Sequence, residues 1–197
     1  IGTGIGGGIV IERKLYFGRQ GYAGEIGHQI IDPAGPICGC GNRGCLEAFA
    51  SAGSIIVQAK EMIKKGKPTL IEKLIGGDLD KITPKIVAQA AREGDAVARK
   101  IWEREAFYLG IGIANLVVIL NPQAVIIAGG ISKAFDLMID RIKETLRERI
   151  LIEVDVEKLK ILKGKLGDMA GAIGAACWAR EKFSGRKTKH PEADESI

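Results

Sequence analysis

The sequence predicts an α/β fold in which helices flank a mixed β-sheet. Residues 124–128 are a short continuous apolar run, the pattern of a strand buried on both faces, and Gly129-Gly130 follow directly. Residues 7–11 and 14–17 are two further apolar runs, separated by a polar pair. Segments with apolar residues three and four positions apart lie between these strands, and that spacing is typical of helices. The alternation of the two patterns favours the α/β class.

The first 20 residues are predicted to form a β-hairpin that turns at Glu12-Arg13. Residues 21–50 follow as an irregular, glycine-rich segment. After Glu47 the pattern becomes helical, because five apolar residues would share one face of a helix: Ile55, Ile56, Ala59, Met62 and Ile63.

Two helix starts are marked by their capping residues. Thr83 precedes Pro84, and a threonine can cap free amides while a proline at the first helical position loses no needed donor. Gly94 is expected to end this helix, and Asp95 to cap the next one. The second helix continues until the Asn-Pro pair at 121–122 stops it. Its length and apolar content predict the central helix of the core.

Three elements are expected after the strand at 124–128. A surface helix should run from about residue 133 to 149, a strand should lie near residues 159–162, and a last helix should extend from residue 168 to about 182. Residues 184–197 are polar and lack apolar periodicity, which predicts a flexible tail. Residues 1–183 are therefore expected to form one folded unit.

Composition narrows the function classes. Among 197 residues, 29 Lys and Arg against 24 Asp and Glu give a net charge of +5, but the basic residues are scattered and no basic run is interleaved with aromatics. The charge favours a mildly basic surface without a nucleic-acid partner. If a polyanion binds, MgATP is the preferred candidate. No apolar run reaches the roughly 18 residues that span a bilayer, because polar residues and a proline interrupt the region 110–127. No membrane segment is expected.

One histidine and three cysteines form the most informative cluster. His28, Cys38, Cys40 and Cys45 supply the four ligands of a closed tetrahedral zinc site, and the glycines beside Cys40 let the backbone curl around an ion. We interpret the cluster as structural zinc. Reduced thiolates on a metal suit the cytoplasm better than an oxidising compartment. The fourth cysteine, Cys177, lies in an apolar segment and is expected to be a small buried side chain.

Two glycine-rich segments are candidates for binding a nucleotide. Gly2-Thr3-Gly4 opens the hairpin, where backbone amides can approach an anion closely and the threonine hydroxyl adds a donor. Gly129-Gly130 lie between a strand and a helix, where open α/β sheets bind nucleotides. The alternative in both cases is a purely geometric role in a tight turn.

The cluster also resembles the signature of the ROK family of sugar kinases and sugar-responsive repressors. The matching residues are Gly27-His28, then nine residues, then Cys38-Gly39-Cys40-Gly41-Asn42-Arg43-Gly44-Cys45-Leu46-Glu47. The resemblance implies an actin-like ATPase or ribonuclease H-like lobe with a zinc-stapled loop. It also implies that Gly2 to Gly4 contact phosphate, that Gly129-Gly130 lie against adenosine, and that Glu25, His28 and Glu47 line a sugar pocket. The implied cofactors are zinc and Mg-ATP.

The family's first phosphate motif, Asp-x-Gly-Gly-Thr, and its catalytic Asp in an Asn-Asp pair precede the glycine hairpin, and neither is present here. The chain begins with Ile1 inside a motif, so we expect it to correspond to the C-terminal portion of a longer protein, and we assign no catalytic residue.

Two functions from different classes follow from the resemblance. One is a glucokinase-like hexose kinase. The other is the effector-binding portion of a ROK repressor, the only case in which nucleic acid would be a partner. The glycine segments favour the kinase, because a repressor has no need of a nucleotide cleft. A zinc-stabilised binding module without catalysis describes the chain taken alone. Self-association is also expected, because the apolar helices exceed what this chain can cover.

Overall fold

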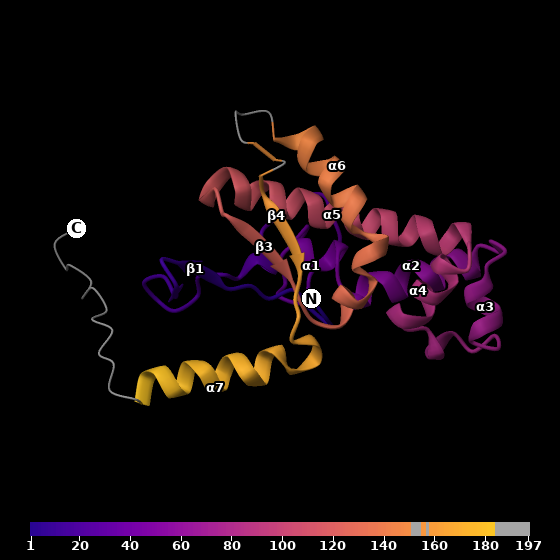
Figure 1. Cartoon of the computed structure of the whole chain (residues 1–197). Helices are drawn as coiled ribbons and strands as arrows, with labels where there is room; N and C mark the ends of the chain where they lie inside the picture. Colours follow the sequence, from indigo (N-terminus) through magenta and orange to yellow (C-terminus); the bar gives the residue numbers. More distant parts are fainter. Residues whose placement is uncertain (151–154, 157, 184–197) are drawn as a thin grey trace.

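A computed structural model describes residues 1–150, 155–156 and 158–183. Figure 1 shows the helices gathered around one long helix, with two small sheets beside them and a last helix extending away from the rest. The predicted tail at 184–197 lies outside the described residues.

The chain opens with the predicted hairpin. Strand β1 (Ile9–Ile11) pairs antiparallel with β2 (Lys14–Tyr16), and Ile9 lies opposite Tyr16. The two turn residues, Glu12 and Arg13, both have positive φ, at 51° and 66°. Two left-handed residues make the tight turn whose twist matches that of a hairpin. The hairpin prediction is confirmed.

A segment with little regular structure connects the hairpin to the first helices. It contains a 3₁₀ turn, η1 (Ile26–His28), and ends in the short helix α1 (Leu46–Phe49). Four more elements follow it: α2 (Ala52–Lys64), α3 (Leu70–Leu74), η2 (Leu79–Lys81) and α4 (Pro84–Arg92). The hydroxyl of Thr83 accepts a hydrogen bond from the Ile86 amide, so the predicted cap of α4 is confirmed.

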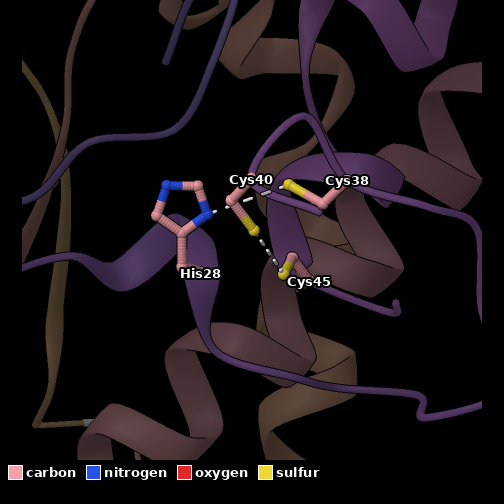
Figure 2. Close-up of side chains that lie close together, drawn as sticks. All are labelled: His28, Cys38, Cys40 and Cys45. Carbon is pink, nitrogen blue, oxygen red and sulfur yellow. Dashed lines mark hydrogen bonds between the residues drawn. The ribbon is translucent and has the colours of Figure 1, made fainter. Parts of the chain in front are cut away.

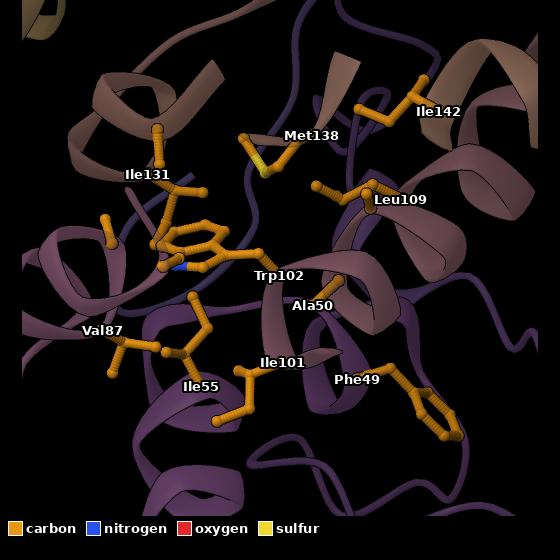
Figure 3. Packing of buried hydrophobic residues seen from close by; sticks show 14 of the residues in the cluster. Phe49, Ala50, Ile55, Val87, Ile101, Trp102, Leu109, Ile131, Met138 and Ile142 are labelled. Atoms are coloured by element: carbon orange, nitrogen blue, oxygen red, sulfur yellow. The ribbon is translucent and has the colours of Figure 1, made fainter. Parts of the chain in front are cut away.

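Helix α5 (Ala96–Leu120) is the predicted central helix. The Asp95 carboxylate caps it by accepting from the amide of Ala98, and the same side chain accepts from Leu70 at the start of α3. The helix contacts α1, α2, α4 and α6. Figure 3 shows how its Trp102 lies in the core, with its ring between Ile55, Val87 and Ile131.

Strands β3 (Ala124–Ile127) and β4 (Lys160–Lys163) are parallel partners in a second sheet. The single mixed sheet that we expected is therefore wrong for the described residues, which form two separate two-stranded sheets. The expectation of a fully buried strand is also wrong, since Ile126 is 65 % exposed and only Ile127 is buried. The face of β3 that carries Ile126 is not covered by another layer among the described residues.

The expected surface helix from residue 133 is divided in two. The 3₁₀ segment η3 (Gly130–Leu137) precedes α6 (Ile139–Arg149), and the backbone leaves helical geometry at Ala134. Arg92 of α4 contacts the segment on both sides of the break. Its guanidinium donates to the Lys133 carbonyl and binds the Asp136 carboxylate at 2.7 Å. The Lys133 carbonyl therefore accepts a hydrogen bond from a side chain of another helix.

The last elements are η4 (Gly167–Met169) and α7 (Ala170–Phe183). Helix α7 has no buried residue, and Trp178 meets Phe17 with ring centroids 5.9 Å apart. Cys177 is exposed, so the expectation that it is buried is wrong. Its apolar neighbours suggested burial, but they have no core to join in the described structure. No helix of the described ranges is long and apolar enough to cross a bilayer.

Candidate functional site

His28, Cys38, Cys40 and Cys45 converge on one point. All four ligand atoms lie within 4.8 Å of one another. Sγ of Cys38 is 3.8 Å from Nδ1 of His28, and Sγ of Cys40 is 3.7 Å from Sγ of Cys45 (Figure 2). Zinc–sulfur bonds of about 2.3 Å in a tetrahedron place neighbouring sulfurs about 3.8 Å apart. The donor set and its spacing both fit a closed zinc site.

Local backbone geometry brings these ligands together. Cys38 and Asn42 bracket a tight turn in which the Cys38 amide donates to the Asn42 carbonyl and the Gly41 amide to the Cys38 carbonyl. Gly41 has a φ of +91°, a conformation that L side chains rarely adopt. Cys45 then stands at the N-terminus of α1 and pairs with Ile30, which holds it near the η1 turn carrying His28.

The thiols of the cluster differ in environment. Burial raises the pKa of the Cys45 thiol to about 12, and its side chain has no exposed surface. Cys40 is exposed, and a backbone hydrogen bond from Asn42 lowers its pKa. A buried thiol becomes a thiolate only beside strong positive charge, which a divalent cation provides. The cluster is therefore chemically suited to a metal ion, because without a cation the buried thiol of Cys45 would stay protonated.

The three sugar candidates lie around this cluster. His28 turns Nδ1 toward Cys38, while its Nε2 lies 4.0 Å from the carboxylate of Glu25. On the other side, Oε1 of Glu47 is 3.6 Å from Sγ of Cys38, which donates to it. The side chain of Glu25 is 59 % exposed. The structure therefore brings all three candidates together, and Glu25 retains open acceptor oxygens.

Glu47 makes a second contact that the sequence analysis missed. Its Oε2 accepts a hydrogen bond of 2.8 Å from the backbone amide of Ile5. Gly4 has no room for a Cβ because the Glu47 carboxylate lies against it, and Gly27 is equally close to the Ile5 carbonyl. The glycine hairpin and the cluster segment thus pack backbone to backbone. Gly4 and Gly27 could have indicated this contact, because glycine often occurs where another segment approaches the backbone closely.

The two candidate nucleotide segments also lie side by side. The amino group of Ile1 donates to the Ala128 carbonyl at 2.6 Å, and the Ile131 amide donates to the Ile1 carbonyl at 3.2 Å. Gly129 has a φ of +86°, and backbone atoms of Ile1 fill the place of its missing Cβ. Thr3 and Gly130 remain exposed. Segments nearly 130 residues apart in the sequence therefore meet at the end of β3.

Known proteins resemble this chain over most of its length. The sequence profile of the ROK family matches residues 1–182. The chain belongs to the ROK family. The glucokinase of Thermotoga maritima is 39% identical over 185 residues, which cover 94% of this chain and 58% of that enzyme. The xylose repressor of Caldicellulosiruptor bescii is also 39% identical, over 175 residues that cover 88% of this chain and 43% of the repressor.

Solved ROK structures confirm the fold. A ROK glucokinase from Streptomyces griseus, in complex with glucose and AMPPNP, superposes with a TM-score of 0.83 at 37% identity, covering 92% of this chain and 59% of that one. A ROK transcriptional regulator, a homologue of the E. coli MLC protein, gives 0.73 at 34% identity, covering 83% and 40%. The predicted actin-like α/β fold is therefore correct. The chain spans about three fifths or less of the length of these ROK proteins.

Proposed function

We propose that this ROK chain provides the sugar- and nucleotide-binding face of an ATP-dependent hexose kinase resembling glucokinase. The observation that carries the proposal is the contact between the two glycine segments at Ile1 and Gly129, beside a cluster that gathers Glu25, His28 and Glu47. A sugar-binding protein that uses no nucleotide has no need of the first feature. The glucokinase that binds glucose and AMPPNP has the same fold, which adds support.

In this proposal His28, Cys38, Cys40 and Cys45 hold a structural zinc ion. The 3.7 and 3.8 Å separations of their ligand atoms support it. The ion fixes the segment from residue 28 to residue 45, and with it the two flanking carboxylates of Glu25 and Glu47. It serves recognition by holding these side chains in place.

Glu25, His28 and Glu47 are proposed to orient the hexose. A carboxylate can accept hydrogen bonds from two hydroxyls, and the exposed carboxylate of Glu25 has oxygens open to a ligand. His28 Nε2 lies between the cluster and Glu25, so it can reach the same ligand. Removing the Glu25 carboxylate should weaken sugar binding more than it changes nucleotide binding.

Gly2, Thr3 and Gly4 are proposed to contact the phosphates of Mg-ATP, and Gly129 and Gly130 the adenosine. The exposed Thr3 hydroxyl and the exposed Gly130 backbone support these roles. Mg-ATP supplies the phosphoryl group, and this chain's part is to position it and the sugar. The acidic residues of the site have orienting roles, so we assign none of them as the general base.

The alternative is the effector-binding portion of a ROK repressor. The 39% identity to a xylose repressor favours it as much as the same identity favours a glucokinase. The two proposals differ in one measurable respect. A kinase portion must bind nucleotide and sugar together, whereas a repressor portion needs the sugar alone.

Calorimetric titration of the zinc-loaded chain separates the two. Glucose and xylose are each titrated in the absence and presence of AMPPNP, and AMPPNP is titrated alone. Binding of both sugar and AMPPNP supports the kinase. Sugar binding without AMPPNP binding favours the repressor, and absence of sugar binding contradicts both. An ADP-release assay with MgATP and a hexose panel then tests turnover.

We also propose self-association and a cytoplasmic location. Large apolar side chains remain exposed on several elements, including Ile126 at 65%, Trp178 at 45% and Phe183 at 90%. A second copy of the chain could bury such uncovered apolar side chains. Light scattering should give a mass above the 21.1 kDa of one chain. A mass of one chain at high concentration would contradict self-association. The three thiols of the cluster suit a reducing compartment.

A further inference from the structure

The two carboxylate oxygens of Glu47 face two different segments. Oε1 is 3.6 Å from Sγ of Cys38, a ligand of the cluster, and Oε2 accepts the 2.8 Å hydrogen bond from the Ile5 amide. Ile5 and Glu47 are 42 positions apart in the sequence. One side chain therefore lies between the cluster and the backbone of the glycine hairpin, and it belongs to the segment that directly follows Cys45.

The surroundings of this contact leave little freedom. Ile5 is 6% exposed, and the Gly4 Cα lies against the Glu47 carboxylate. Gly27, the residue before the ligand His28, packs on the Ile5 carbonyl. The hairpin backbone at Ile5 is thus held by Gly27, one position before His28, and by Glu47, two positions after Cys45.

The contact also sets the direction of a neighbouring peptide group. The Ile5 amide already donates its hydrogen bond to Glu47, so it holds the backbone in place and does not donate to a ligand. The peptide plane between Gly4 and Ile5 takes its orientation from this hydrogen bond, because the N–H lies in that plane and the peptide group is rigid. Glycine is otherwise the least restricted residue, so without this anchor the loop would sample many conformations.

We propose that Glu47 is a positioning residue for nucleotide binding. When the metal cluster is ordered, Glu47 accepts the hydrogen bond from the Ile5 amide and so holds the glycine hairpin in one conformation. The inference rests on the proposed function of the cluster and of the hairpin. When zinc binds, Cys38 loses the proton that it donates to Glu47, so the ion acts on Glu47 through Cys45, which lies two positions before it in the chain. With Glu47 held in place, the hairpin presents its amides to phosphate in one arrangement. Linkage requires that bound nucleotide in turn strengthens zinc binding by the same factor.

Hydrogen–deuterium exchange of the full chain tests the connection without any activity assay. Zinc should slow exchange of the Ile5 amide by about tenfold, the effect of one hydrogen bond to a charged acceptor. Glu47→Gln keeps an acceptor oxygen and should retain the zinc effect, whereas Glu47→Ala should lose it. Glu61→Ala, on the exposed face of α2, is the matched control and should behave as the natural sequence does. Equal zinc-dependent protection of Ile5 in Glu47→Ala would overturn the proposal.

Zinc content and circular dichroism of each variant keep the outcomes distinct. Glu47→Ala protein that is folded and zinc-loaded but exchanges Ile5 rapidly supports the proposal. If Glu47→Ala fails to fold, Glu47→Gln decides alone: loss of the zinc effect in that folded variant contradicts the proposal. A chain that binds no zinc contradicts both the proposed metal site and this inference.

Titration with ATP tests the consequence for nucleotide. Zinc-loaded protein should bind ATP about tenfold more tightly than chelated protein, and Glu47→Ala should remove that difference. ATP affinity that is independent of zinc would overturn the positioning role while leaving the zinc site intact. Absence of ATP binding in every form contradicts the nucleotide role itself, even where the Ile5 exchange still responds to zinc.

Discussion

Gly110 of α5 packs directly on Thr145 of α6, and a Cβ at Gly110 would lie 2.6 Å from the Thr145 Cβ. The two helices, which share the most extensive contact in the fold, are therefore brought together at a position where only glycine fits. Helix interiors normally disfavour glycine by up to about 1 kcal/mol relative to alanine, so the packing outweighs the propensity here.

We expect Gly110→Ala to destabilise the protein by about 1–3 kcal/mol, because it overpacks the α5–α6 interface. Urea unfolding measures the change. Gly53→Ala is the matched control, since its Cβ would meet only an ordinary 3.6 Å contact in α2. That variant should be neutral or slightly more stable. A Gly110→Ala protein as stable as Gly53→Ala would show that the interface relaxes freely.

Glu105 is fully buried in α5, and its carboxylate oxygens have no hydrogen-bond partner within the described part of the chain. Burial raises the pKa of Glu105 well above its ordinary value, against a smaller opposite effect of Arg104. The folded state therefore favours the protonated acid. Its contribution to stability is complete below the unfolded pKa and is lost as the pH rises through the folded pKa.

The loss should be about 1.4 kcal/mol per pH unit across that window. Urea unfolding at constant saturating zinc, from pH 5 to 8, measures it as the difference between the natural sequence and Glu105→Gln. The glutamine variant should be the less pH-dependent of the two and the more stable at pH 8. Parallel pH profiles for the two proteins would contradict a raised pKa.

We expect Cys40→Ser to lower zinc content and sugar affinity in parallel, because Glu25 and Glu47 both depend on the ordered cluster. Metal analysis and calorimetry measure the two quantities. Cys177→Ser removes an exposed thiol outside the cluster and should leave both unchanged. Zinc-free protein with undiminished sugar affinity would show that sugar binding does not depend on the metal.

Replacing Glu12-Arg13 by Asn-Gly should stabilise the hairpin by up to about 1 kcal/mol, because both positions have positive φ and these residues adopt it with little strain. Slower exchange of amides in β1 and β2 measures this. The reverse-order pair Gly-Asn serves as a comparison. Faster exchange in the Asn-Gly protein would contradict the turn geometry.

The sequence predicted best what depends on neighbouring residues. The cap at Thr83, the cap at Asp95 and the hairpin turn each involve a few consecutive positions, so local chemistry determines them. The convergence of His28, Cys38, Cys40 and Cys45 was predictable because their donor types are distinctive and they lie within 18 positions of one another.

Long-range contacts explain what the sequence could not predict. At the break in the helix expected from residue 133, Arg92 binds the Lys133 carbonyl and the Asp136 carboxylate, more than 40 positions away. The Glu47 contact with Ile5 spans a similar distance. Apolar composition predicted burial for Ile126 and Cys177, but burial depends on which layers are present to cover a strand or a helix. No local pattern carries that information.

Helix α5 contacts α1, α2, α4 and α6, so it forms one side of the interface with each of these helices. Unfolding of α5 would disrupt all of these interfaces at once, so we expect them to be lost together. Around α5, unfolding should therefore be a single cooperative transition. The apolar side chains of α7 contribute nothing to that transition, and this helix should fray independently and first.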